Sequence, residues 1–221
     1  MKGLAWVLVA GALTASAQVQ VLRPYASCRF DDGLVVAEKS ALPADVAGRA
    51  VMTIAGPRQV PIERGELVTW TYPEGGPFAT LRVEQLPAES YEQGKANLVG
   101  DFDHLLASGN EGARNMAYAL HPMLNGFEVH GLDRTKIDGK NLGIYLLIDD
   151  AKRVVTTVYF LNQGPERRKF ATIEEYGALR EHFLNAYTNC VHAPVVSKAA
   201  VAPTKKAAPA KKKTAAKKKK R

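Results

Sequence analysis

The sequence predicts an α+β fold in which an antiparallel β-sheet packs against two main helices, followed by a disordered basic C-terminal tail. Three observations predict this arrangement: short β-branched and aromatic runs between turn residues, two long segments with helical spacing of apolar residues, and a final stretch made almost wholly of Lys, Ala, Pro and Thr. The 221 residues, 46% of them hydrophobic, suit one globular domain with tails.

Residues 1–17 have the pattern of a secretory signal peptide. Lys2 precedes the uncharged apolar run 3–13, and a small-x-small pattern then predicts cleavage between Ala17 and Gln18. The alternative is a membrane anchor, but the apolar run would reach only about 16 Å as a helix, roughly half of the hydrocarbon core.

The signal defines the expected organisation of the chain. We expect a signal peptide at 1–17, one α+β domain at 18–192 and a disordered tail at 193–221. The mature chain should carry no transmembrane anchor and should be periplasmic or secreted.

Export determines the expectation for the two cysteines. In an oxidising compartment an even pair forms a disulfide, here Cys28–Cys190. The bond would close nearly the whole domain into one loop, which the chain-entropy treatment values at about 4–5 kcal/mol. The alternatives are metal ligation by Cys190 with His192, or two free thiols.

The first half of the domain has the pattern of strands. Residues 19–73 are β-rich, with Val35-Val36 after a turn, an apolar run at 50–55, and the run Leu67–Tyr72 ended by a proline. Residues 78–86 alternate between apolar and polar side chains, which predicts a half-buried strand.

The first clear helix is expected from Glu89 to Ala107. Its apolar residues follow three- and four-residue steps, and Lys95 lies on the same stripe, so the lysine stem would run along the core while its ammonium reaches outward. Ser108-Gly109-Asn110 supplies the stop.

A three-stranded antiparallel meander follows, with strands at 126–132, 142–148 and 154–161. Asp138-Gly139 is a favoured hairpin turn, and Asp149–Lys152 turns the chain again. The last two strands are apolar enough to lie centrally in the sheet.

The second helix begins at a capping box, in which the Thr172 hydroxyl accepts a hydrogen bond from the Glu175 amide and the Glu175 carboxylate reaches back. One stripe of about 120° then contains Ile173, Tyr176, Leu179, Phe183, Tyr187 and Cys190. Cys190 therefore points toward the core, as the disulfide requires.

This order of elements over residues 66–190, with a strand ending in Tyr72-Pro73, resembles the PsbP-type α+β sandwich of photosystem extrinsic proteins and several bacterial exported proteins. The resemblance implies an accessory or binding module and carries over no catalytic residue. The cysteine pair and the lysine tail are not part of that pattern.

The sequence has no nucleophile elbow, phosphate loop, zinc-protease motif or dinucleotide fingerprint, so we expect no catalytic residue, cofactor or metal. One group could carry chemistry. Glu128 and His130 project from one strand face, and if His121 met them at a sheet edge the three could bind a metal or exchange protons. Asp149 and Asp150 read as turn residues.

The net charge of +8 is divided unevenly. Residues 198–221 hold eleven basic residues and no acidic one, whereas residues 18–197 hold 18 basic and 22 acidic residues, a net of −4. The tail resembles histone H1-type tails and has no aromatic residue, which predicts disorder and sequence-independent binding to polyanions. The expected polyanion-binding residues are Lys205, Lys206, Lys211, Lys212, Lys213, Lys217, Lys218, Lys219, Lys220 and Arg221.

These features favour an exported, non-enzymatic binding or accessory module of the cell envelope. Its tail would tether it to an anionic polymer or lipid surface, with extracellular DNA as a further partner. Three alternatives stay open: a small secreted enzyme with a site near His121, Glu128 and His130, a sequence-nonspecific nucleic-acid binder, and a tail that only solvates the protein.

Overall fold

The computed structural model describes residues 21–28, 35–41, 48–72, 76–108, 115–137, 140–162 and 170–192. The predicted signal at 1–17, its cleavage site at Ala17 and Gln18, the Asp138-Gly139 turn and the basic tail lie outside these residues.

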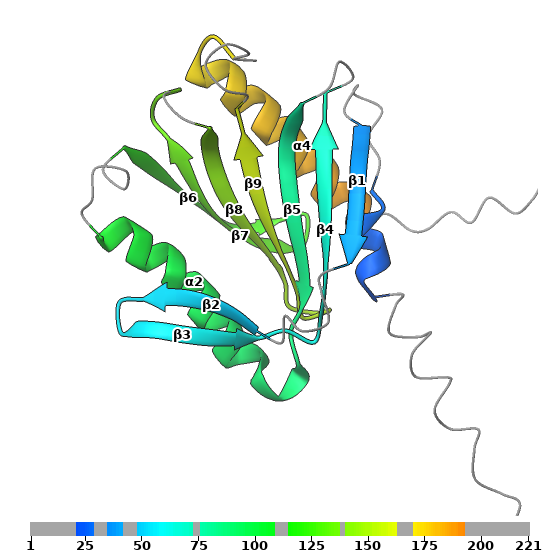
Figure 1. The fold of residues 1–221 in the computed structure, drawn as a ribbon, viewed down its shortest axis with the longest axis vertical. Coiled ribbons are helices and arrows are strands. Elements are labelled where there is room, and N and C mark those ends of the chain that lie inside the picture. The colour runs from blue at the N-terminus through cyan, green and yellow to red at the C-terminus, as the bar shows by residue number, and fades with distance from the viewer. Residues whose placement is uncertain are drawn as a thin grey trace, which may run out of the picture.

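One antiparallel sheet of seven strands, in the order β1-β4-β5-β9-β8-β7-β6, forms the centre of the molecule, and β2 and β3 form a separate hairpin (Figure 1). The strands are β1 (Val35–Ala41), β2 (Gly48–Thr53), β3 (Gly56–Pro61), β4 (Arg64–Thr71), β5 (Pro77–Gln85), β6 (Met116–Leu124), β7 (Phe127–Arg134), β8 (Asn141–Asp149) and β9 (Val154–Leu161). The helical elements are a short helix at 21–26, the 3-10 turn η1 (Ala88–Ser90), α2 (Tyr91–Ala107) and α4 (Ile173–His192).

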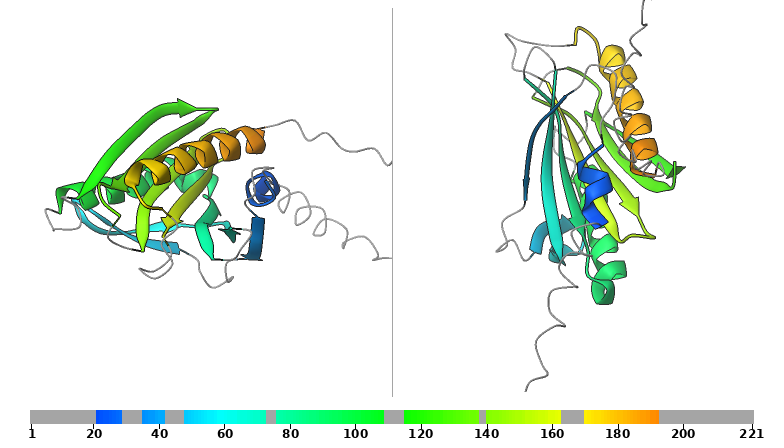
Figure 2. Two further views of the ribbon diagram at one scale, coloured as in Figure 1. Left: turned by 90° about the horizontal axis from the view of Figure 1, so that it is seen from above. Right: turned by 90° about the vertical axis from the view of Figure 1, so that its right-hand side faces the viewer.

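Helix α4 covers one face of the sheet, and the helix at 21–26 lies beside its C-terminal end (Figure 2). The core on this face is aromatic. Phe183 of α4 lies with its ring centroid 5.5 Å from Trp70, 5.6 Å from Phe78 and 5.6 Å from Phe160, in edge-on contacts that add to the burial of apolar area.

Helix α2 and the β2–β3 hairpin cover the opposite face. Leu98 and Phe102 of α2 pack there against Leu146 and Ile148 of β8, whereas Leu147 of β8 belongs to the α4-side core. This alternation along β8 follows from the two-residue period of a strand, and it means that the centre of the sheet is buried on both sides.

The two long helices confirm the sequence prediction. Thr172 accepts a hydrogen bond from the Glu175 amide at 3.3 Å, and the Glu175 carboxylate accepts one from the amide of Ala171 at 2.8 Å, so α4 begins at the expected capping box. In α2 the predicted stripe is buried at Tyr91, Leu98 and Phe102.

Three local predictions were wrong. Residues 21–26, placed in a β-rich segment, are helical. The meander has a fourth strand, β6, because Asn125 and Gly126 adopt positive φ angles of 49° and 90° and so form a tight turn before β7. The expected half-buried strand, β5, is buried on both faces because the β2–β3 hairpin packs over its polar side, where Glu84 is fully buried.

Candidate functional site

The disulfide is present as predicted. Cys28 and Cys190 are bonded with their Cα atoms 5.8 Å apart, and Cys28 is buried. The bond joins the N-terminal helical segment to the last turns of α4, immediately before residue 193, where the expected tail begins. Because Cys190 is oxidised, the alternative in which Cys190 and His192 ligate a metal is wrong.

The three residues His121, Glu128 and His130 do not converge. In the β6–β7 register His121 lies opposite Val129, so its side chain projects to the α4 side of the sheet. Glu128 and His130 project to the α2 side, where their side chains are 2.6 Å apart at His130 Nε2 and Glu128 Oε1. Within the described parts of the chain no group of three or more His, Cys, Asp and Glu residues could hold a metal ion.

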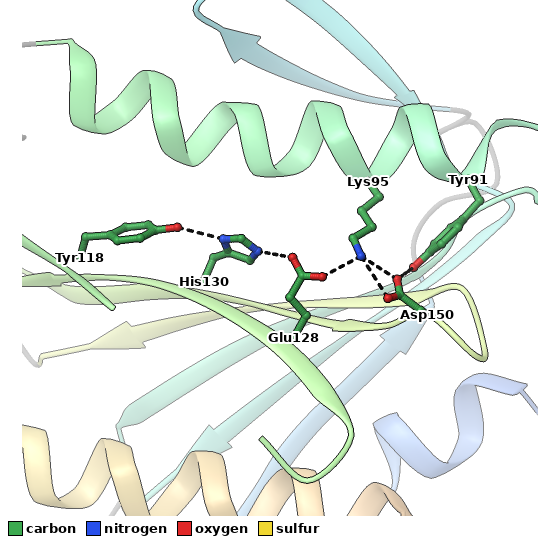
Figure 3. A network of polar contacts seen from close by, with 6 residues as sticks. All are labelled: Tyr91, Lys95, Tyr118, Glu128, His130 and Asp150. Carbon is green, nitrogen blue, oxygen red and sulfur yellow. Dashed lines mark hydrogen bonds and ion pairs between the residues drawn. The ribbon is translucent and has the colours of Figure 1, made fainter. Parts of the chain in front are cut away.

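Instead, Glu128 and His130 belong to a polar network beneath α2 (Figure 3). Lys95 of α2 points toward the sheet, and its ammonium lies 2.7 Å from Glu128 Oε2 and 2.9 Å from Asp150 Oδ1. Tyr91, one turn earlier in α2, donates a hydrogen bond to the same Asp150 carboxylate. The lysine that the sequence placed on the apolar stripe therefore bridges two carboxylates.

The network fixes the charge of its members at neutral pH. Burial alone would raise the pKa of Glu128, but hydrogen bonds from Lys95 and His130 outweigh it and lower the pKa. Asp150 likewise has a lowered pKa, because the bonds from Tyr91 and Lys95 outweigh its burial. For Lys95 the two carboxylates outweigh burial in the other direction and raise the pKa. One cation is thus held between two anions.

At its other end the network reaches Tyr118 of β6. The Tyr118 hydroxyl lies 3.0 Å from His130 Nδ1, and its pKa is raised by burial and by the carboxylates of Asp103 and Glu128. The hydroxyl therefore keeps its proton and can donate a hydrogen bond to Nδ1, and Nε2 lies within hydrogen-bond distance of the Glu128 carboxylate. Both nitrogens of His130 are already used, so the arrangement orders α2, β6 and β7 relative to one another.

A second polar cluster lies on the opposite face, at the end of α4. Asp149 is buried and accepts hydrogen bonds from the Tyr25 hydroxyl at 2.6 Å and from His192 Nε2 at 2.9 Å. His192 Nδ1 lies 2.6 Å from the carbonyl oxygen of Asn125, and the ring stacks on Phe127 with centroids 4.7 Å apart. Both ring nitrogens face acceptors, so both contacts are satisfied together only when both nitrogens carry hydrogens.

This cluster borders a cavity of about 330 Å³ next to the start of the predicted tail. The lining residues are Val21, Pro24, Tyr25, Asp149, Lys152, Val191 and His192. The disulfide, His192 and Asp149 together fix the last turn of α4.

Replacing Lys95 by methionine is expected to lower the free energy of unfolding by about 1–2 kcal/mol at pH 7, because Glu128 and Asp150 lose their shared cation and solvent screens the share of the 58% exposed Asp150. The folded chain lowers both carboxyl pKa values from their ordinary 4.5 and 3.8. The stabilisation is therefore present above about pH 5 and is lost as the pH falls below those values.

Urea unfolding of wild type and Lys95→Met at pH 7 and at about pH 3 checks this, with a smaller difference expected at the lower pH. Lys152→Met, at an exposed lysine in the turn that follows β8, is the matched control. Equal losses for the two variants at pH 7, or a difference independent of pH, would contradict the assignment.

Sequence reasoning missed Lys95, Tyr118 and His192 as members of polar clusters, and treated Asp149 and Asp150 as turn residues only. Asp149 does serve its turn by accepting the Lys152 amide at 3.2 Å. The sequence did contain one signal for both clusters, the adjacent carboxylates Asp149 and Asp150 at the end of an apolar strand. Neighbouring residues of a strand project to opposite faces, so one carboxylate was bound to lie on each side of the sheet.

No helix in the described residues is both long and apolar enough to cross a membrane. Comparison with known proteins finds no match among family models, curated proteins or solved structures, so the PsbP-type and histone-type resemblances stay expectations.

Proposed function

We propose that this chain is an exported, non-enzymatic binding or accessory module of the cell envelope, held at an anionic surface by its basic tail. The observation that carries the proposal is the separation of charge: eleven basic residues and no acidic one at 198–221, against a net of −4 over 18–197. A signal peptide cleaved after Ala17 would deliver the chain to the periplasm or outside the cell, where anionic lipids and polymers are the available partners.

The disulfide supports this location, because such bonds form and persist in oxidising compartments. A PsbP-type sandwich for the folded domain is part of the proposal, since members of that fold act mostly as accessory modules. The central strands β8 and β9 are buried on both faces, and both ring nitrogens of His130 and of His192 already have partners within the domain. These features support a rigid accessory module that binds its partners through its outer surface.

The binding should be electrostatic and independent of sequence. Each lysine or arginine near an anionic membrane contributes about 1 kcal/mol, and we expect about half of the tail charges to be engaged at one time. On duplex DNA the same arm would give a slope of log K against log salt of about −0.9 for each phosphate contact, or near −5 for half of the tail.

The test uses the mature chain, residues 18–221, with vesicles that contain anionic lipid and with neutral vesicles. Replacing Lys205, Lys206, Lys211, Lys212, Lys213, Lys217, Lys218, Lys219, Lys220 and Arg221 by glutamine is expected to weaken vesicle binding by about 100-fold or more and to leave the melting temperature of the domain unchanged. Replacing the same lysines by arginine is the control and should keep the binding.

Retention of binding by the glutamine variant, with an unchanged salt slope, would contradict the tether. Binding to duplex DNA without binding to vesicles or to soluble anionic polysaccharide would favour the nucleic-acid alternative. A tail that binds none of them would leave only its solvating role.

A further inference from the structure

Strand β6 is an open edge of the sheet. It is the last strand in the sheet order and, within the described parts of the chain, it pairs with β7 alone. Its outward-facing N–H and C=O groups pair with no strand of the described residues, and such groups can hydrogen-bond to a strand of another chain, as at any uncovered edge.

This edge is also apolar. The sequence of β6, MAYALHPML, contains no Asp, Glu, Lys or Arg. Tyr118, Leu120 and Met123 are 40%, 53% and 66% exposed, and they make up half of the large exposed hydrophobic residues in the described chain. Edge strands are usually protected by charges, and a long uncharged edge is a site of strand pairing.

The protection that β6 does carry is confined to one end. His121 pairs with Val129 and Leu124 pairs with Phe127, so Pro122 and Met123 share a single position opposite β7 in a bulge. The stretch Met116–His121 pairs regularly with β7 and is left unprotected.

We propose that β6 pairs antiparallel with β6 of a second copy of this chain, about a two-fold axis close to Ala119, so that Tyr118 of one copy lies opposite Leu120 of the other and the ladder stays within the regular stretch Met116–His121. Leu120 lies opposite His130 in the register and so projects to the α2 side, where Met116 packs against the second core. Pairing places the apolar strip of one copy beside the same strip of the other and extends that core across the axis.

The charge of the tails favours an antiparallel pair. His192 contacts the Asn125 carbonyl at 2.6 Å, which places the start of each tail at the Leu124 end of β6. Antiparallel pairing puts the points at which the two tails begin at opposite ends of the paired strands. A strand of nine residues is about 30 Å long, so the two points are separated by well more than the Debye length of about 8 Å. The strand itself has no charge to oppose its own copy.

Such a dimer carries two tails, which would increase avidity for an anionic surface, but the pairing does not depend on what the tails bind. A dimer that persists when the ten cations of residues 205–221 are replaced by glutamine separates this inference from the proposed function.

The test measures the mass of the oxidised mature chain in solution by sedimentation up to about 100 µM. Wild type should be a dimer. Leu120→Lys and Leu120→Glu should each weaken the dimer by about 100-fold or more, because each sets two like charges on the same face of the sheet, one residue to either side of the axis. Mixing the two variants in equal amounts should restore a heterodimer.

Ile54→Lys is the matched control, since Ile54 is 72% exposed at the tip of the β2–β3 hairpin, and it should leave the dimer intact. Hydrogen exchange of wild type gives a measurement without substitution: amides of Met116–His121 should exchange more slowly at high than at low protein concentration.

A wild-type monomer at about 100 µM would overturn the proposal. So would a dimer that survives both Leu120 variants, which would assign the interface to another surface such as the β1 edge. A monomer whose β6 amides become protected only when a different protein is added would assign the edge to a foreign strand.

Discussion

Replacing Glu84 by glutamine is expected to cost about 3–5 kcal/mol of unfolding free energy, the range for breaking a buried ion pair. Glu84 lies on β5 and its side chain is fully buried. Its carboxylate pairs with Arg82 on the same strand and with Arg49 of β2 at 3.2 Å, and Arg49 also donates to the Thr157 hydroxyl at 2.8 Å. Glutamine keeps the shape but leaves two arginines without their counter-charge.

Urea unfolding at pH 7 measures this effect. Glu89→Gln is the matched control, because Glu89 is exposed on η1, and a change within about 0.5 kcal/mol is expected there. A double change of Arg49 and Glu84 to methionine should cost less than Glu84→Gln, since it removes both partners of one buried pair at once. Equal effects of Glu84→Gln and Glu89→Gln would show that Glu84 does not hold the β2–β3 hairpin on the sheet.

Replacing Cys28 and Cys190 together by alanine is expected to cost about 2–5 kcal/mol of unfolding free energy. The two cysteines are 162 residues apart, so the bond closes most of the folded chain and restricts its unfolded state strongly. Both lie against the α4-side core, so alanine leaves no buried polar atom behind.

Thermal and urea unfolding of the oxidised wild type, the reduced wild type and the double-alanine variant measures this loss. The reduced protein and the variant should unfold alike, and reductant should not affect the variant. The sequence has only two cysteines, so thiol titration of the denatured, unreduced protein is a direct control. Two reactive thiols in exported protein would contradict the bond.

Periodicity in the sequence was sufficient for the long elements. The stripe on α4 predicted its core-facing side, on which Cys190 is half-buried, because every third or fourth residue of a helix returns to the same side. Strands β8 and β9 were predicted as central because their sequences are apolar enough to require cover on at least one face. Strand β6 was missed because apolar and polar residues do not alternate along its sequence. In the structure most of its side chains are exposed, so its positions do not alternate between buried and exposed either.

The polar clusters depended on contacts between distant residues. Lys95 and Asp150 are 55 residues apart, and Tyr25 and Asp149 are 124 apart, so no local spacing connects them. His121 was grouped with Glu128 and His130 although the turn at Asn125-Gly126 and the register of β6 on β7 place it on the other face. A shift of register by one residue exchanges the two faces of a strand, and local sequence does not fix that register.

The sequence by itself therefore determined the fold class, the two long helices, the central strands and the cysteine pair, because periodicity and composition are properties of short segments. The tertiary structure alone decided which charged groups meet, which face each one occupies and which edge of the sheet stays open. Those features are set by strand order and register, which bring together residues that the chain holds far apart.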